Sequence, residues 1–148
     1  MQRAFPFYFL GVHQMDISKF AAQDSSDLQL RTADDQPLIG DDGVQVSITC
    51  YGPGSKAYQR AQSTSQNKLI DRMKRKGNVD QTPEEKAAQR ADFLAACTVS
   101  FNGFDYKGKA DQAAFKAAYA DSEIGFVTDQ VEKFISDWAN FTTASTTA

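Results

Sequence analysis

The side chains that could do chemistry in this sequence are few and widely spaced. There are two cysteines, Cys50 and Cys97, and one histidine, His13. A catalytic nucleophile needs a base within hydrogen-bond reach, and a zinc site needs several convergent ligands. A disulfide scaffold in a chain of this size would need more cysteines. We therefore expect two reduced, partly buried thiols, with no metal site and no cofactor.

Two acidic pairs, Asp34-Asp35 and Asp41-Asp42, are the remaining candidates for a metal site. Neither pair has the spacing of an EF-hand loop, and aspartates are common in turns because they hydrogen-bond to nearby backbone groups. The sequence also lacks a phosphate-binding loop, a dinucleotide-binding glycine motif and a zinc-protease motif. We therefore expect turns at both pairs and no enzymatic activity. A hydrolase built on a carboxylate pair is the one enzymatic alternative that stays open.

A basic segment interrupts an otherwise acidic chain. Residues 55–76 carry seven basic side chains and one acidic one, whereas 1–54 carry three and seven, and 77–148 carry six and eleven. The cations crowd the end of the segment at Lys68, Arg72, Lys74, Arg75 and Lys76. They fit a solvated helix face favoured by the helix dipole. They also fit an acidic protein partner or the acidic flanks of a second copy. The lack of aromatic residues in 62–79 disfavours nucleic acid.

Length and composition indicate one soluble globular domain. The chain has 148 residues, of which 41% are apolar and 24% charged, and its formal net charge of −3 excludes a polycation that coats nucleic acid. The apolar run near the N-terminus is too short to span a bilayer and lacks a cleavage site of the signal-peptide type. We expect an N-terminal extension over 1–14, with Met15 as an alternative start, a single domain over 15–141, and a flexible tail over 142–148.

Alternating apolar and polar residues predict strands in the first third of the chain. Residues 27–31 alternate, and residues 44–51 alternate more clearly. Turn-forming residues occupy 32–37 and 40–43. These segments predict a small antiparallel meander, and one strand face would carry Val44, Val46, Ile48 and Cys50.

Capping signals and 3–4 spacing predict about four helices after the meander. Ser55 caps a helix over 56–76 that ends at Gly77-Asn78, and Thr82, Pro83 and Glu85 start a second helix that reaches about Ala96. A short helix is expected around 112–119 and a strongly amphipathic one around 126–139.

Between the second and third helices we expect a short β-hairpin. Asn102-Gly103 is typical of a type I′ turn, and it lies between 98–101 and 104–106. The predicted fold class is therefore α+β: a small N-terminal antiparallel β-meander followed by about four α-helices with a short β-hairpin between them.

Two groups of residues are the candidates for binding a partner. The helix over 56–76 combines a sparse apolar stripe with the cations. The last helix carries more large aromatic side chains than one helix of a small domain usually buries, so part of its face is available for docking. The candidate residues are Tyr58, Leu69, Ile70, Arg72, Met73, Lys74, Arg75, Phe126, Phe134, Trp138 and Phe141.

Three blocks of the sequence form an ordered pattern. The first runs from Val46 to Tyr58 and contains Tyr-Gly-Pro-Gly-Ser-Lys-Ala-Tyr; the second is Thr98-Val-Ser-Phe-Asn-Gly-Phe104. The third is Ile124-Gly-Phe-Val-Thr-Asp-Gln-Val-Glu-Lys-Phe134, followed by Trp-Ala-Asn-Phe141. In this order and spacing the blocks resemble the tail assembly chaperones of long-tailed, siphophage-type bacteriophages over about residues 15–141. The chain departs from that pattern at Phe101, where a tryptophan is expected, and residues 1–14 have no counterpart.

The resemblance implies a non-enzymatic protein of phage tail morphogenesis that is made in the host cytoplasm and is absent from the mature virion. Such chaperones bind the long helical tape-measure protein, keep it soluble and help recruit tail-tube subunits around it. An uncovered tape-measure chain exposes apolar stripes, which a helix-in-groove contact repeated in many copies would cover. The expected partners are therefore the tape-measure protein, the tail-tube protein and further copies of this chain, with no nucleic acid and no membrane.

Two alternative functions remain. The first is a structural virion subunit, such as a tail-tube or head–tail joining protein. A tube subunit needs enough strand for a continuous intersubunit sheet, and the few short strands expected here disfavour it. The second is a nucleic-acid-binding regulator that uses the cations of residues 68–76, which predicts steeply salt-dependent binding to DNA.

Overall fold

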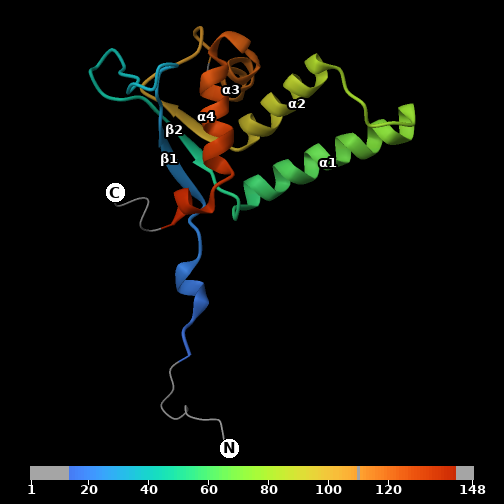
Figure 1. The fold of residues 1–148 in the computed structure, drawn as a ribbon, viewed down its shortest axis with the longest axis horizontal. Coiled ribbons are helices and arrows are strands. Elements are labelled where there is room, and N and C mark those ends of the chain that lie inside the picture. Colours follow the sequence, from blue (N-terminus) through green and yellow to red (C-terminus); the bar gives the residue numbers. More distant parts are fainter. Residues whose placement is uncertain (1–13, 110, 143–148) are drawn as a thin grey trace, which may run out of the picture.

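Three antiparallel strands form the sheet of this α+β fold (Figure 1). The computed structural model describes residues 14–109 and 111–142. In it β1 (Ser25–Gln29) pairs with β2 (Ser47–Tyr51), which pairs with β3 (Thr98–Asn102). The predicted fold class is confirmed, because four α-helices accompany the antiparallel sheet.

Alternation along the strands gives the sheet one apolar and one polar face. Ile48 and Cys50 of β2 are completely buried. On the opposite face, Thr49 donates a hydrogen bond of 2.6 Å to Asp27 and accepts one of 2.8 Å from the Asn102 amide. Side chains two residues apart lie on the same face of a strand, so the apolar set faces the core and the polar set faces away from it.

Three helices and the apolar face of the sheet enclose the core. They are α2 (Pro83–Ala96), α3 (Asp111–Ala120) and α4 (Gly125–Ile135), and α4 runs across the sheet (Figure 1). α2 begins with the predicted capping box, in which the Thr82 hydroxyl accepts from the Glu85 N–H and the Glu85 carboxylate accepts from the Thr82 N–H. The largest completely buried side chains are Leu30, Ile48, Leu94, Val131, Ile135 and Phe141.

The longest helix, α1 (Lys56–Lys76), extends away from this body as an arm (Figure 1). The Ser55 hydroxyl caps its start by accepting from the Tyr58 N–H, and Gly77 ends it with a φ of 75°. Both bounds agree with the prediction from the sequence. Ala61 is its only buried residue, so most of the arm contributes nothing to the core.

The predicted strand bounds needed correction. β1 lies two residues before the predicted 27–31, and β2 begins at Ser47. Val44 is therefore outside the strand and is 63% exposed, although the pattern placed it on the buried face. Within the described residues the sheet has three strands, because 104–106 does not pair with β3 as the predicted hairpin requires.

The hairpin prediction failed because β3 has a partner distant in sequence. β3 pairs with β2, and the Asn102 amide donates to Ser47 as well as to Thr49 across this pair. Of the two presumed turn residues, only Gly103 has a positive φ. A type I′ turn needs positive φ at both residues, so the corner cannot be one.

The last predicted helix, 126–139, is divided in two. α4 ends at Ile135, and a 3-10 turn, η4 (Trp138–Phe141), follows it. Asp137 separates them because its backbone is extended and its carboxylate accepts from the Ala139 N–H, as aspartates do when they cap a new turn. The short helix predicted over 112–119 is one residue longer at each end. The predicted extension and tail lie outside the described residues apart from Gln14 and Thr142.

The absence of a side chain at Gly52 leaves room for Phe141 of η4 to pack against the end of β2. A Cβ atom at Gly52 would lie 2.6 Å from the ring of Phe141, which is completely buried. We expect Gly52→Ala to lower the free energy of unfolding by about 1–3 kcal/mol through overpacking. The matched control is Gly125→Ala, because Gly125 has helical dihedral angles and open space at its Cβ position.

Chemical denaturation of the two alanine variants and the wild type measures this difference. Gly125→Ala should be neutral or slightly stabilising, since alanine is the better helix former. An unchanged midpoint for Gly52→Ala would contradict the contact with Phe141.

Candidate partner-binding surface

A forked ion pair holds the far end of α1 against α2. The Arg72 Nη1 and Nη2 atoms each donate a hydrogen bond of 2.9 Å to the Glu85 carboxylate, and Nε donates one of 2.7 Å to the carbonyl of Asp80. Only 16% of the Arg72 side chain is exposed. An arginine fork sets direction as well as distance, so these contacts orient the arm.

The Glu85 carboxylate is shared between the ion pair and the start of α2. Its pKa falls from the ordinary value of 4.5 to about 2, first because the Thr82 N–H donates to it and next because Arg72 does. A depressed pKa means that the ionised form stabilises the folded state above about pH 4.5. This stabilisation is lost as the pH falls from 4.5 toward 2.

Closer to the body, small residues and one aromatic pair join the two helices. Tyr58 meets Phe93 edge to face with ring centroids 5.5 Å apart. Lys68 reaches Asp92 at 3.3 Å, although both side chains are about half exposed. An open groove runs between the helices and is lined by Ala57, Arg60, Ala61, Thr64, Ser65, Lys68, Asp92, Phe93 and Ala96.

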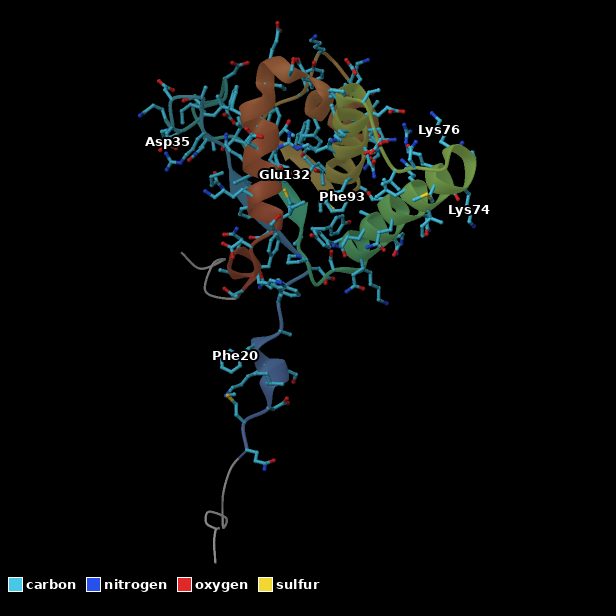
Figure 2. All side chains as sticks on the ribbon, turned by 45° about the vertical axis from the view of Figure 1, so that its right-hand side comes forward. Phe20, Asp35, Lys74, Lys76, Phe93 and Glu132 are labelled. Atoms are coloured by element: carbon cyan, nitrogen blue, oxygen red, sulfur yellow. The ribbon has the colours of Figure 1, made fainter. Side chains whose placement is uncertain are left out.

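The side of α1 that faces away from α2 carries two apolar residues with cations beside them. Lys68 and Arg72 are four residues apart and both face α2. Residues two positions from them point the other way on a helix, so Ile70 and Lys74 lie on the outer side. Ile70 is 51% exposed and Met73 48%. Figure 2 shows Lys74 and Lys76 at the free end of the arm. We call Ile70, Met73 and Lys74 the outer face of α1.

The other candidate residues on α1 have different environments. Tyr58 is half-buried at the base of the arm, and burial raises its pKa. Leu69 is half-buried near the α2 side. Arg75 is exposed, and its Nε donates to the carbonyl of Asp71 one turn earlier. The side chain of Arg72 is engaged by α2, so it positions the arm and does not present its guanidinium to a partner.

The C-terminal aromatic residues separate into core and surface. Phe141 is completely buried and packs against Phe134 with ring centroids 5.3 Å apart. Phe134 and Phe126 are half-buried against the core. Trp138 is 57% exposed and lies beside Gly54, where an added Cβ would come within 3.1 Å of the indole ring.

The structure therefore does not bring the two groups of candidates into one surface. Trp138 lies beside Gly54, just before α1 begins, whereas Ile70 and Met73 lie toward its other end. From Lys56, where α1 begins, to Ile70 the helix rises through fourteen residue steps, or about 21 Å at 1.5 Å per residue. A partner that contacts both would have to follow the length of the arm.

Several exposed apolar residues were not among the candidates from the sequence. Met15, Ile17 and Phe20, on and beside the 3-10 turn η2 (Ile17–Phe20), are 59%, 71% and 62% exposed. Figure 2 shows Phe20 and its turn apart from the body. Ile39 and Val44, between β1 and β2, are more than half exposed. Periodicity could not find the second group, because the strand pattern assigned Val44 to the core.

The remaining chemistry of the described residues is limited. Burial raises the pKa of both thiols, that of Cys97 to about 12, which leaves them in the thiol form. Residues 14–109 and 111–142 hold no group of three or more histidine, cysteine or acidic side chains placed to share a metal ion. Over the same residues, no helix combines the length and apolar character that crossing a bilayer requires.

Comparison of the chain with protein-family models, with curated proteins and with solved structures found no match.

The Arg72–Glu85 pair makes a prediction about the pKa of Glu85. Replacing Arg72 with methionine removes both its hydrogen bond to Glu85 and its charge, and it leaves the Thr82 N–H in place. In Arg72→Met we therefore expect the Glu85 pKa to rise from about 2 part of the way to 4.5. An NMR titration of the carboxyl group measures it.

Lys86→Met is the matched control, because Lys86 is an exposed lysine next in sequence and is not among the causes of the shift. An unchanged Glu85 pKa in Arg72→Met would show that the two side chains do not meet in solution.

Proposed function

We propose that this chain is a siphophage-type tail assembly chaperone. In this role it binds the tape-measure protein, keeps it soluble and helps recruit tail-tube subunits in the host cytoplasm, without entering the mature virion. The observation that carries the proposal is the arm, a 21-residue helix with one buried residue and an apolar pair on its outer face. The ordered sequence blocks that resemble this family support it.

The chemistry of the outer face suits a helical partner. Ile70 and Met73 are three residues apart and form an apolar ridge along the arm. An amphipathic helix buries its own stripe against such a ridge through positions spaced three or four apart. Methionine is unbranched and flexible, so Met73 can adapt to different apolar sequences. A protein that must bind many sites along one long chain needs this tolerance.

The expected strength of each contact also fits the role. Two half-exposed apolar side chains can add only about 1.5–3 kcal/mol in total if a partner buries them fully. A single site of this kind is weak, but many copies along one tape-measure chain would coat it, and the assembling tube could displace them one by one. The cations beside the ridge would speed encounters with acidic partner segments.

The strands favour this function over a structural tube subunit. β1, β2 and β3 each have five residues, and β2 is already paired on both sides. A tube wall needs longer strands that continue from one subunit to the next. Within residues 14–109 and 111–142, only the two outer strands, β1 and β3, offer free edges, and both are short.

The experiment is co-expression with the tape-measure protein of the same genome, followed by affinity purification. We expect wild-type chain to recover soluble tape-measure protein with several copies bound. The double variant Ile70→Ser, Met73→Ser should recover about tenfold less tape-measure protein. Each serine removes an apolar side chain that the partner would bury, which weakens binding at every site by about 1 kcal/mol or more.

The matched control is Ile17→Ser, which removes an exposed apolar residue away from the arm. It should recover as much tape-measure protein as the wild type. If the partner stays insoluble with wild-type chain, the chaperone proposal fails. If recovery falls equally in the control and the arm variant, the arm is not the binding surface.

A further inference from the structure

The segment between β1 and β2 forms an exposed acidic surface. It contains Asp34, Asp35, Asp41 and Asp42, and we call residues 32–45 the acidic loop. In the part of the chain that the structure describes, only Asp35 of these four forms an ion pair, at 3.7 Å from the exposed Arg31. Two apolar side chains lie among the carboxylates, Ile39 at 54% and Val44 at 63% exposed.

The C-terminal end of α1 forms a surface of positive charge. Lys74, Arg75 and Lys76 are exposed there, and no carboxylate among the described residues forms an ion pair with them. Val79 follows at 47% exposed. We call residues 74–79 the basic tip. It shares Lys74 with the outer face of α1 but includes neither Ile70 nor Met73.

The two surfaces cannot satisfy each other within one molecule. Asp35 and the pair Lys74 and Lys76 lie on opposite sides of the molecule in Figure 2, with the body between them. The acidic loop projects from the sheet beyond β1 and β2, whereas the arm extends from the other side (Figure 1). Each surface is therefore available to another molecule.

We propose that the basic tip of one copy docks on the acidic loop of the next, so that the chain assembles head to tail. A contact between two different surfaces of the same protein is heterologous, and it either closes into a ring or continues as an open array. The contact needs only this chain. It therefore goes beyond the tape-measure interaction and holds or fails independently of it.

Charge and apolar content both favour a second copy as the occupant. The tip offers three cations beside Val79, and the loop offers four carboxylates around Ile39 and Val44. Association would bring opposite charges together and cover exposed apolar side chains on both surfaces. A symmetric tip-to-tip contact would instead oppose cations with cations. Nucleic acid would pair with the tip and leave the acidic loop uncovered.

Two charge-reversal variants each disable one surface. Lys74→Glu with Arg75→Glu changes the formal charge of the tip from +3 to −1, and Asp34→Lys with Asp41→Lys cancels the formal charge of −4 on the loop. The loop variant keeps Asp42, which accepts from the Val44 N–H, and Asp35, whose φ is 64°. The control Lys86→Glu with Lys133→Glu makes the same charge change as the tip variant on exposed lysines of α2 and α4.

The first measurement is the molar mass of each purified protein by light scattering over a range of concentrations. Wild type and the control variant should rise to multiples of the 16.3 kDa chain as concentration increases. Each reversal variant alone should stay at the mass of one chain. Raising the ionic strength from about 0.05 to about 0.5 M should dissociate the wild type, since salt screens exposed charges.

The decisive measurement mixes the two reversal variants. The tip variant retains an intact loop and the loop variant retains an intact tip, so together they can form one contact and no more. We expect the mixture to give a one-to-one dimer although neither component associates alone. Recovery of the dimer also shows that both variants are folded.

Three results would overturn the proposal. The first is a wild-type chain that stays monomeric at every concentration. The second is an association that neither reversal weakens, which would place the contact elsewhere. The third is a mixture that stays monomeric while circular dichroism shows both variants folded, which would exclude the tip-to-loop contact.

Discussion

The contact of Arg72 with Glu85 decides where the longest helix points. α1 buries only Ala61, so hydrophobic packing cannot hold its outer half in place. Two hydrogen bonds from one guanidinium connect that half to Glu85 in the first turn of α2, and a third reaches the carbonyl of Asp80 just before α2. Because Glu85 also closes the capping box of α2, the same carboxylate stabilises the beginning of one helix and the position of the other. The direction of the arm depends on the Glu85 side chain, and so do both surfaces proposed on the arm.

The chain divides its apolar residues between two tasks. Most large side chains of α3, α4 and the sheet pack into one core, and Phe141 of η4 completes it against Gly52. The outer half of the arm uses its inner side for ion pairs with α2, and Ile70 and Met73 stay exposed. Exposed apolar side chains that lie next to each other are the part of this helix that a partner could cover.

Local signals in the sequence were sufficient to predict both ends of α1 and the start of α2. Ser55 and Gly77 mark both ends of α1, and Thr82 with Glu85 marks the start of α2, because capping depends on residues within one turn. The errors came from contacts distant in sequence. Asn102 was assigned to a hairpin turn, but its amide joins β3 to β2. The amphipathic spacing of α4 continues through Trp138, and it gave no sign that Asp137 would end the helix.

The candidate surface was predictable only in part. The sequence alone identifies the cations at the end of α1, but it does not show which of them contact α2 and which are exposed. Arg72 and Lys68 are held by carboxylates of α2, while Lys74 and Arg75 are exposed. Which of two neighbouring cations faces another helix depends on how the two helices pack, and no sequence pattern shows that. The sequence predicts turns at the acidic pairs and allows the acidic flanks of a second copy to pair with the cations, but it does not show that the loop and the tip lie on opposite sides of the molecule (Figure 2).

Hydrogen exchange of the backbone amides, compared between the free chain and its complex with the tape-measure protein, would show whether α1 acts as an exposed binding arm. In the free chain, the outer half of α1 should exchange much faster than β2 and α4, because it can open without disturbing the core. In the complex, the gain in protection should concentrate in residues 66–79. Equal protection of α1 and the core in the free chain, or a gain confined to the sheet, would contradict the account of α1 as an exposed binding arm.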